Sequence, residues 1–319
     1  MPGPPARVTR TSASESLAGL LQMVQLEPMI AFVTSERFAF LDAKDRDRLE
    51  ALAKLDQFSD GQEVSASGTP SEWLSLIVSG GVDLRTRTKD GEITLARLGP
   101  GDIYGELETF ADLPEGVRHV ARGETIVRAV NKHPLKQELK VHRSLASGLL
   151  AVYCRSISEK VRAANEVATG RSTGLSRPPP RLGPRPPHLS VEEVAWLSVL
   201  GLDASAASGD SVVQEGDTSR SFYVVVSGEL EVRKHAAGGE ERTLATLGPR
   251  DMFGIMAFVD GKPRSASVIA RSEVSLSRVE VDVLEKATHL NFTVSFKFLG
   301  TLCSVLGRTY RDTVYSIVG

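Results

Sequence analysis

The sequence has little of what a disulfide-stapled, membrane-spanning or strongly charged protein needs. Only two of its 319 residues are cysteines, and the absence of a CxxC pair argues against a disulfide framework. Lysine and arginine number 38 against 40 aspartate and glutamate, so the formal net charge of −2 creates no general field for gripping nucleic acid. No run approaches the ~20 apolar residues of a membrane span. The N-terminus lacks the apolar stretch of a secretory signal, and we expect a cytoplasmic protein.

Motifs for catalysis and for metal binding are also missing. The six histidines form no i, i+4 pair and lie apart from the cysteines. There is no Gly-x-Ser-x-Gly elbow and no P-loop. The sequence therefore predicts no enzymatic activity, no catalytic residue, no metal site and no required cofactor. Cys154 and Cys303 each lie in an apolar helical stripe and are predicted to be small buried hydrophobes, because a redox role needs an electropositive, partly open site.

Changes in texture along the chain divide it into four parts. Residues 1–15 hold prolines among small polar side chains, which predicts disorder. Residues 16–169 form a first domain, in which glycine-punctuated strands at about 58–133 are typical of an antiparallel sandwich or barrel. Residues 170–188 carry six prolines and four arginines and no acidic residue, which indicates an extended linker that is either a spacer or a ligand for a proline-recognition domain. Residues 189–319 form a second domain.

The second domain repeats the first. Ser79-Gly80 returns as Ser227-Gly228, 148 residues later, and Leu98-Gly99-Pro100 returns as Leu247-Gly248-Pro249, 149 residues later. Gly105 matches Gly254 and Cys154 matches Cys303 at the same offset of 149. Similarity at one long offset indicates duplication of a whole domain. The second barrel is therefore expected at about 203–282, with a closing helix at about 291–317.

The repeated unit resembles the cyclic nucleotide-binding domain family, which includes catabolite activator-type regulators, kinase regulatory subunits and gated channels. The resemblance rests on residues 216–232 and 247–254 and on Pro263-Arg264-Ser265-Ala266, and it extends over about 58–163 and 203–312. It implies a mainly β fold with flanking helices: two jelly-roll β-barrels, each followed by a closing helix. In this family an arginine and a short helix hold a cyclic phosphate, and a glutamate accepts the ribose 2′-hydroxyl.

Carried over one residue at a time, the resemblance gives an incomplete ligand site in each copy. The candidate ligand-binding residues are Gly254, Arg264, Ser265 and Ala266 in the second copy and Gly105 and Glu106 in the first. Ile255 stands at the glutamate position of the second copy, where an unpaired ribose donor costs ~1–3 kcal/mol. Glu115 stands at the arginine position of the first copy, where its repulsion of a phosphate at ~4 Å is about 4 kcal/mol.

Each candidate also has an ordinary structural interpretation. Gly105 and Gly254 could serve only a tight turn, Arg264 could pair with a surface carboxylate, and Glu106 could sit at a helix N-terminus. Arg118 could reach inward in place of the missing arginine. An open second pocket with Arg264 pointing inward would favour ligand binding, whereas Ile255 or Met256 filling the pocket would favour its loss.

Two functions follow from these departures. The first hypothesis is a non-enzymatic scaffold or accessory protein built from two degenerate barrels that acts through protein–protein contacts. The second is a regulatory sensor in which only the second barrel binds a cyclic nucleotide or another phosphate-bearing ligand and signals to a protein partner. Direct DNA binding is not expected, because the chain ends at Gly319 directly after its last helix. That helix carries spare apolar surface, which predicts a partner: the equivalent helix of the first repeat, or a second copy of the chain.

Overall fold

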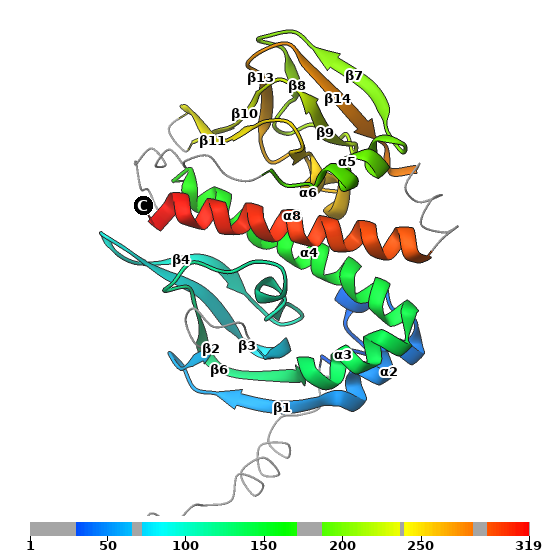
Figure 1. Ribbon diagram of the computed structural model, residues 1–319. Helices are drawn as coiled ribbons and strands as arrows, with labels where there is room; N and C mark the ends of the chain where they lie inside the picture. The colour runs from blue at the N-terminus through cyan, green and yellow to red at the C-terminus, as the bar shows by residue number, and fades with distance from the viewer. Residues whose placement is uncertain (1–29, 66–71, 171–186, 237–238, 283–291, 319) are drawn as a thin grey trace, which may run out of the picture.

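A computed structural model describes residues 30–65, 72–170, 187–236, 239–282 and 292–318 (Figure 1). The predicted disordered segment 1–15 and nearly all of the predicted linker 170–188 lie outside these described residues. Among the described residues, no helix is both long enough and apolar enough to cross a membrane.

The first domain is an antiparallel barrel flanked by helices. The sheet order is β1-β6-β3-β4, with β2 added to β6 and β5 added to β3. Its elements in chain order are η1 (Glu36–Phe38), α2 (Ala43–Leu52), β1 (Ala53–Phe58), β2 (Glu63–Ser65), β3 (Trp73–Thr88), β4 (Gly91–Leu98), β5 (Ile103–Tyr104), η2 (Leu107–Thr109), β6 (Arg118–Asn131), α3 (Lys132–Val141) and α4 (Arg143–Ala168).

The second domain repeats this arrangement with shorter strands in two four-stranded sheets. One sheet has the order β11-β10-β13-β8 and the other β12-β9-β14-β7, and every pairing is antiparallel. Its elements are α5 (Val191–Ser198), β7 (Leu202–Ala206), β8 (Ser211–Val213), β9 (Phe222–Ser227), β10 (Leu230–His235), β11 (Glu241–Leu247), β12 (Met252–Phe253), α6 (Ile255–Asp260), β13 (Ser267–Ala270), β14 (Val274–Val279) and α8 (Phe292–Val318). The predicted fold of two jelly-roll barrels with flanking helices is confirmed.

One glycine in each copy explains why the strands can cross from one face of the barrel to the other. Gly80 has φ +73° within β3, and a Cβ there would lie 2.3 Å from the Glu124 carbonyl oxygen. Gly228, its counterpart, has φ +86° and would place a Cβ 2.3 Å from the Glu273 carbonyl oxygen. Only glycine combines the left-handed backbone with this close approach. The repeated Ser-Gly of the sequence therefore marks the bend that closes each barrel.

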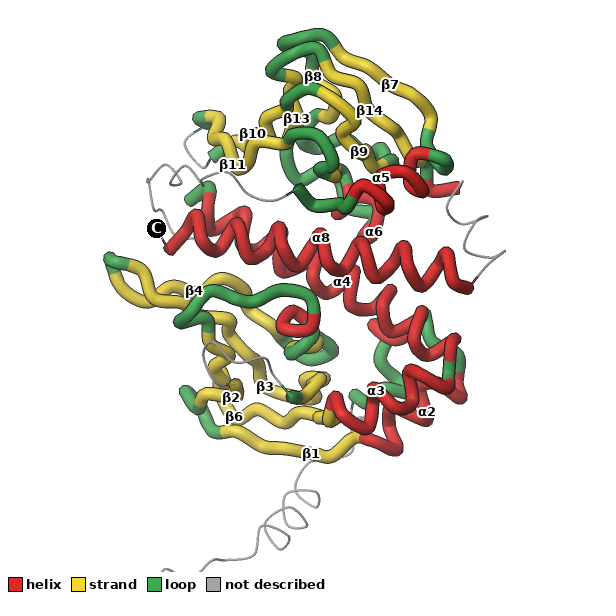
Figure 2. The backbone as a smooth tube through the Cα atoms, in the orientation of Figure 1, coloured by secondary structure: helices red, strands yellow, loops and turns green. Residues whose placement is uncertain are grey.

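The closing helices α4 and α8 lie side by side between the two barrels (Figures 1 and 2). Residues at equivalent positions meet there: the Cys154 and Cys303 Sγ atoms are 3.1 Å apart. The Cys154 thiol donates to the Leu299 carbonyl (3.5 Å), and the Cys303 thiol donates to the Leu150 carbonyl (3.4 Å). The two helices thus pack with approximate two-fold symmetry. Of the two partners predicted for the last helix, the structure shows the equivalent helix of the first repeat.

Both thiols are free and buried, as their apolar helical stripes indicate. Burial is the main cause of a Cys303 pKa well above the ordinary value of a thiol. Cys303 therefore lacks the stabilised thiolate of a reactive cysteine.

Candidate ligand-binding site

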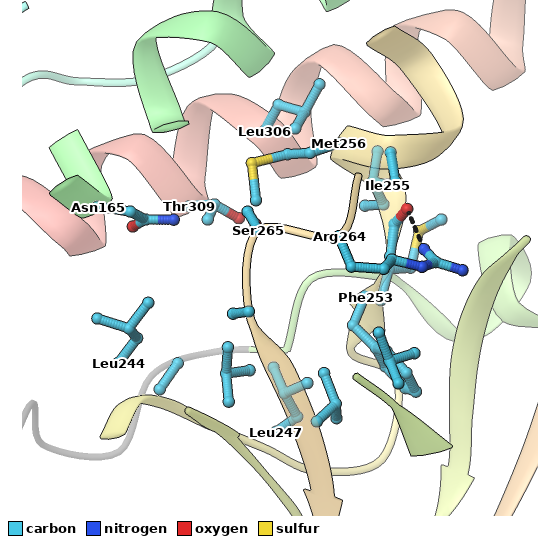
Figure 3. Close-up of a pocket in the computed structure, with 18 of the residues that line it drawn as sticks. Asn165, Leu244, Leu247, Phe253, Ile255, Met256, Arg264, Ser265, Leu306 and Thr309 are labelled. Atoms are coloured by element: carbon cyan, nitrogen blue, oxygen red, sulfur yellow. Dashed lines mark hydrogen bonds between the residues drawn. The ribbon is translucent and has the colours of Figure 1, made fainter. Parts of the chain in front are cut away.

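A cavity of about 130 Å³ lies between the second barrel and the two central helices (Figure 3). Its walls come from three places in the fold. Barrel strands supply apolar side chains that include Val213, Val232, Leu247 and Val268. The segment from Gly254 to Ala266 supplies Gly254, Ile255, Met256, Ala257, Arg264, Ser265 and Ala266. The helices supply Asn165 from α4 and Leu306, Thr309, Asp312 and Thr313 from α8.

Arg264 is held at the cavity wall by neutral partners. Its guanidinium donates to the Gly254 carbonyl (2.9 Å) and the Ser221 carbonyl (2.7 Å), and also to the hydroxyls of Ser219 and Ser221. The side chain runs past Ile255, away from Asn165 (Figure 3). Within the part of the chain that the structure describes, every acceptor of this guanidinium is neutral. Burial lowers the Arg264 pKa because desolvation penalises the charged form, although an arginine stays protonated.

The backbone around Arg264 is fixed on both sides. Its N–H donates to the Asp217 carbonyl (2.7 Å), and its carbonyl accepts from the Gly216 N–H (2.9 Å). Gly254 has φ +81°, and a Cβ there would lie 2.6 Å from Arg264 Nη1. The glycine is therefore needed both for its backbone conformation and for room beside the guanidinium.

The apolar wall of the cavity and its polar side face each other. Ile255 is buried at the start of α6 and, with Met256, lines the cavity without filling it. On the helix side, Thr313 Oγ1 donates to Asn165 Oδ1 (3.2 Å), and Thr309 Oγ1 donates to the Val305 carbonyl (2.9 Å). The helices therefore bring an amide, two hydroxyls and the Asp312 carboxylate, which pairs with Arg311, to the cavity. Such groups fix the orientation of a ligand in a mainly apolar pocket.

Sequence reasoning missed this polar side. Helical periodicity does not tell which turn of α8 passes over the barrel, nor that α4 of the first domain contributes a residue. A usable signal was present in the repeat, because Thr309 stands 149 residues after Lys160, so both copies place a polar side chain at this point of an apolar helix.

In the first barrel the corresponding space holds a buried ion pair. Lys160 of α4 pairs with Glu106, and their side chains are 2% and 0% exposed. Ser156 Oγ donates to Glu106 Oε1 (2.8 Å), and Lys160 Nζ donates to the Ile103 carbonyl (2.9 Å). The offset of 149 relates Glu106 to Ile255 and Lys160 to Thr309. The second copy thus lacks both charges where its cavity lies.

The other residues that the sequence singled out in the first copy are Gly105, Glu115 and Arg118. Gly105 has φ +95° and forms the turn before Glu106. Glu115 is exposed to solvent, and Arg118 pairs with Glu63 and Glu92 rather than reaching inward. The structure brings Gly254, Arg264, Ser265 and Ala266 together at one cavity, but it does not bring an arginine to Glu106.

Comparison with known proteins identifies the class to which this architecture belongs. The family model described as "Cyclic nucleotide-binding domain" matches residues 55–142 and 204–289, which together make up more than half of the chain. The chain therefore belongs to the cyclic nucleotide-binding domain family, with one domain in each copy of the repeat.

Particular relatives resemble the chain over different lengths. A cAMP-dependent protein kinase regulatory subunit of Blastocladiella emersonii is 22% identical over 273 residues, covering 83% of this chain and 57% of that protein's length. The cyclic AMP receptor protein of Thermus thermophilus is 40% identical over 68 residues, and the match covers 21% of this chain and 32% of the length of that receptor protein. The regulatory domain of Toxoplasma gondii PKA, solved with cAMP, is 17% identical with a TM-score of 0.29, and the match covers 82% of this chain and 90% of that one.

These relatives are regulatory subunits and receptor proteins rather than enzymes, in agreement with the prediction that the chain is not an enzyme. The chain carries tandem cyclic nucleotide-binding domains and resembles kinase regulatory subunits. This resemblance favours the regulatory hypothesis over the scaffold.

Proposed function

We propose that the chain is a regulatory sensor whose second barrel binds a cyclic nucleotide or a related phosphate-bearing ligand and signals its presence to a protein partner. The observation that carries this proposal is the cavity, which is lined on one side by Arg264 and Ser265 and on the other by polar side chains of both central helices. The names of the relatives make a protein kinase the first class of partner to test.

The electrostatics of Arg264 support an anionic ligand. The guanidinium is desolvated, yet its described partners are neutral carbonyls and hydroxyls. A phosphate would supply the missing opposite charge in the bidentate geometry that arginine favours. Because the guanidinium now binds Gly254 and Ser221, we expect it to exchange these carbonyls for phosphate oxygens when the ligand enters.

The opposite end of the cavity suits a heterocyclic base. Asn165, Thr309 and Thr313 offer donors and acceptors beside the apolar side chains Met256 and Leu306. A base can use both, because its faces are apolar and its edges polar. Ile255 gives the ribose hydroxyl no acceptor, and we expect affinity for a ribonucleotide to be weakened roughly five- to hundredfold for this reason.

The first barrel is assigned no ligand. Glu106 is already occupied by Lys160 and Ser156, and Arg118 is engaged at the surface. A nucleotide there would have to break a buried ion pair and would find Glu115 where the family's phosphate-binding arginine stands. We therefore expect one ligand for each chain.

Isothermal titration calorimetry of the full chain with cAMP and cGMP tests the proposal. The expected result is a micromolar isotherm with a stoichiometry near one for at least one nucleotide. Arg264→Ala should abolish it, because a charged hydrogen bond contributes about 1.5–3 kcal/mol and the arginine makes more than one. Arg271→Ala is the matched control, since Arg271 is exposed and lies outside the cavity. Absence of heat with wild-type protein and either nucleotide would refute the sensor and leave the scaffold hypothesis.

A further inference from the structure

We propose that helix α4 of the first domain holds the Arg264–Ser265 dipeptide of the second barrel in its binding position, so that Arg162 and Glu166 are positioning residues for the ligand site. This inference rests on the proposed function for its meaning, but its structural part is testable without ligand. It makes the second barrel dependent on the first domain.

Arg162 donates hydrogen bonds to the segment that leads into Arg264. Its Nε donates to Asp260 Oδ2 (2.7 Å), its Nη2 to Asp260 Oδ1 (3.0 Å) and its Nη1 to the Pro263 carbonyl (3.0 Å). Asp260 is the last residue of α6, and Pro263 directly precedes Arg264. One guanidinium therefore ties together both ends of the 260–263 turn. The Asp260 side chain is fully buried and also accepts from Ser158 Oγ (2.9 Å).

Glu166 acts on the other side of the dipeptide through Lys234. The Lys234 ammonium lies 3.0 Å from Glu166 Oε1 and donates to the Ser265 carbonyl (2.7 Å). The Lys234 side chain is 4% exposed, and it also pairs with Glu215 at 3.3 Å. A buried lysine on β10 thus connects α4 to the backbone of Ser265.

These contacts form one device. We call Arg162, Glu166, Asp260 and Lys234 the α4 clamp. Arg162 and Glu166 are one helical turn apart and therefore share a face of α4. Asn165, which lines the cavity, lies between them in sequence. The clamp therefore fixes the two ligand-binding residues and the helix side of the cavity relative to each other.

Among the described residues, the equivalent positions of α8 form no such clamp on the first barrel, so the clamp is not a general consequence of the two-fold packing. At the positions equivalent to Arg162 and Glu166, α8 carries Arg311 and Tyr315, and Arg311 pairs with its own neighbour Asp312. Asp260 is replaced by Ala111, which packs on α8 near Gly307. Such an apolar contact packs the helix against the barrel but makes no hydrogen bond to the turn that contains Ala111.

Linkage gives the clamp a regulatory consequence. If its intact state raises ligand affinity by some factor, bound ligand must stabilise the clamp by the same factor. Ligand bound in the second barrel would then stabilise the contacts of α4, which is part of the first domain. The clamp thereby offers a route from the ligand site to the surface of the first domain.

Hydrogen–deuterium exchange of the ligand-free full chain tests the structural part. Arg162→Ala should increase exchange about tenfold or more in residues 255–266, because a buried charged partner is lost, and should leave residues 104–113 of the first barrel unchanged. Arg155→Ala is the control, since Arg155 lies on the same helix and pairs with Glu159 at 3.7 Å. Arg162→Lys serves if the alanine variant folds poorly, and it should give a smaller increase. Unchanged exchange in both variants would overturn the proposal.

Calorimetric titration with cAMP tests the link to binding. Arg162→Ala and Asp260→Ala should each weaken binding about tenfold or more, and the double variant should weaken it no further, because the two residues act through one contact. Unchanged affinity in both single variants, with wild-type protein binding normally, would overturn the positioning role alone. If wild-type protein binds neither cAMP nor cGMP while Arg162→Ala still raises exchange at 255–266, the sensor proposal fails and the structural role of the clamp stands.

Discussion

The buried pair that closes the first barrel allows a quantitative test of how the two copies differ. Lys160→Met keeps the length of the side chain and removes its charge. Glu106 would then remain fully buried with Ser156 as its remaining donor. Breaking one partner of a buried ion pair costs about 3–5 kcal/mol, because the other charge is left uncompensated.

Adding Glu106→Leu should recover most of this loss, because a buried ion pair and a well-packed apolar pair of similar volume differ little in stability. Urea denaturation followed by circular dichroism measures both effects, with Lys140→Met, on the exposed surface of α3, as the control. If Lys160→Met costs less than about 1 kcal/mol, or if the two substitutions add instead of compensating, the pair does not hold the barrel closed.

Three further predictions follow from the same structure. Ile255→Glu alone should strengthen cAMP binding roughly five- to hundredfold in calorimetry, and adding Thr309→Lys should abolish binding by copying the first barrel's ion pair into the cavity. Cys154 and Cys303 should resist Ellman's reagent in the native protein and both react in denaturant, because both thiols are buried away from the reagent and burial raises the pKa of the Cys303 thiol; rapid native labelling would contradict this. Burial raises the pKa of Tyr104 to about 12 and raises the pKa values of Tyr153 and Tyr310 further. Because the unfolded chain loses these protons near pH 10 and the folded one does not, stability should fall by about 1.4 kcal/mol per pH unit for each such tyrosine as pH rises from 10 towards 12, measurable by urea denaturation at each pH.

The repeat and the strand–glycine scaffold were predictable from the sequence, and so was the place in the fold of the candidate segment from Gly254 to Ala266. Repeated dipeptides such as Ser79-Gly80 and Ser227-Gly228 mark a backbone geometry that only glycine permits. Because no other residue can replace these glycines, the repeat can be recognised directly in the sequence. The chemistry of Arg264 was predictable only as a residue type. Its partners include two backbone carbonyls, which every residue carries and which no sequence pattern distinguishes, besides the hydroxyls of Ser219 and Ser221.

The buried ion pair of the first barrel could not be predicted because it depends on one lysine in a long helix. Lys160 would ordinarily be assigned to solvent, since an uncompensated lysine is almost never fully buried. Its burial is understandable only with Glu106, which lies 54 residues away and reaches it through the tertiary fold. The contribution of Asn165 to the other domain's cavity has the same origin.

Helix α4 contacts both barrels because two of its faces carry different ion pairs. Lys160 turns towards Glu106 of its own barrel, whereas Arg162, two residues on and thus rotated by about 200°, turns towards Asp260 of the other barrel. A rigid helix cannot change one set of contacts without moving the other. The Lys160–Glu106 ion pair therefore also anchors the helix that supports the candidate site in the second barrel. On the proposed function, an occupied first barrel and a ligand-binding second barrel follow from one helix position.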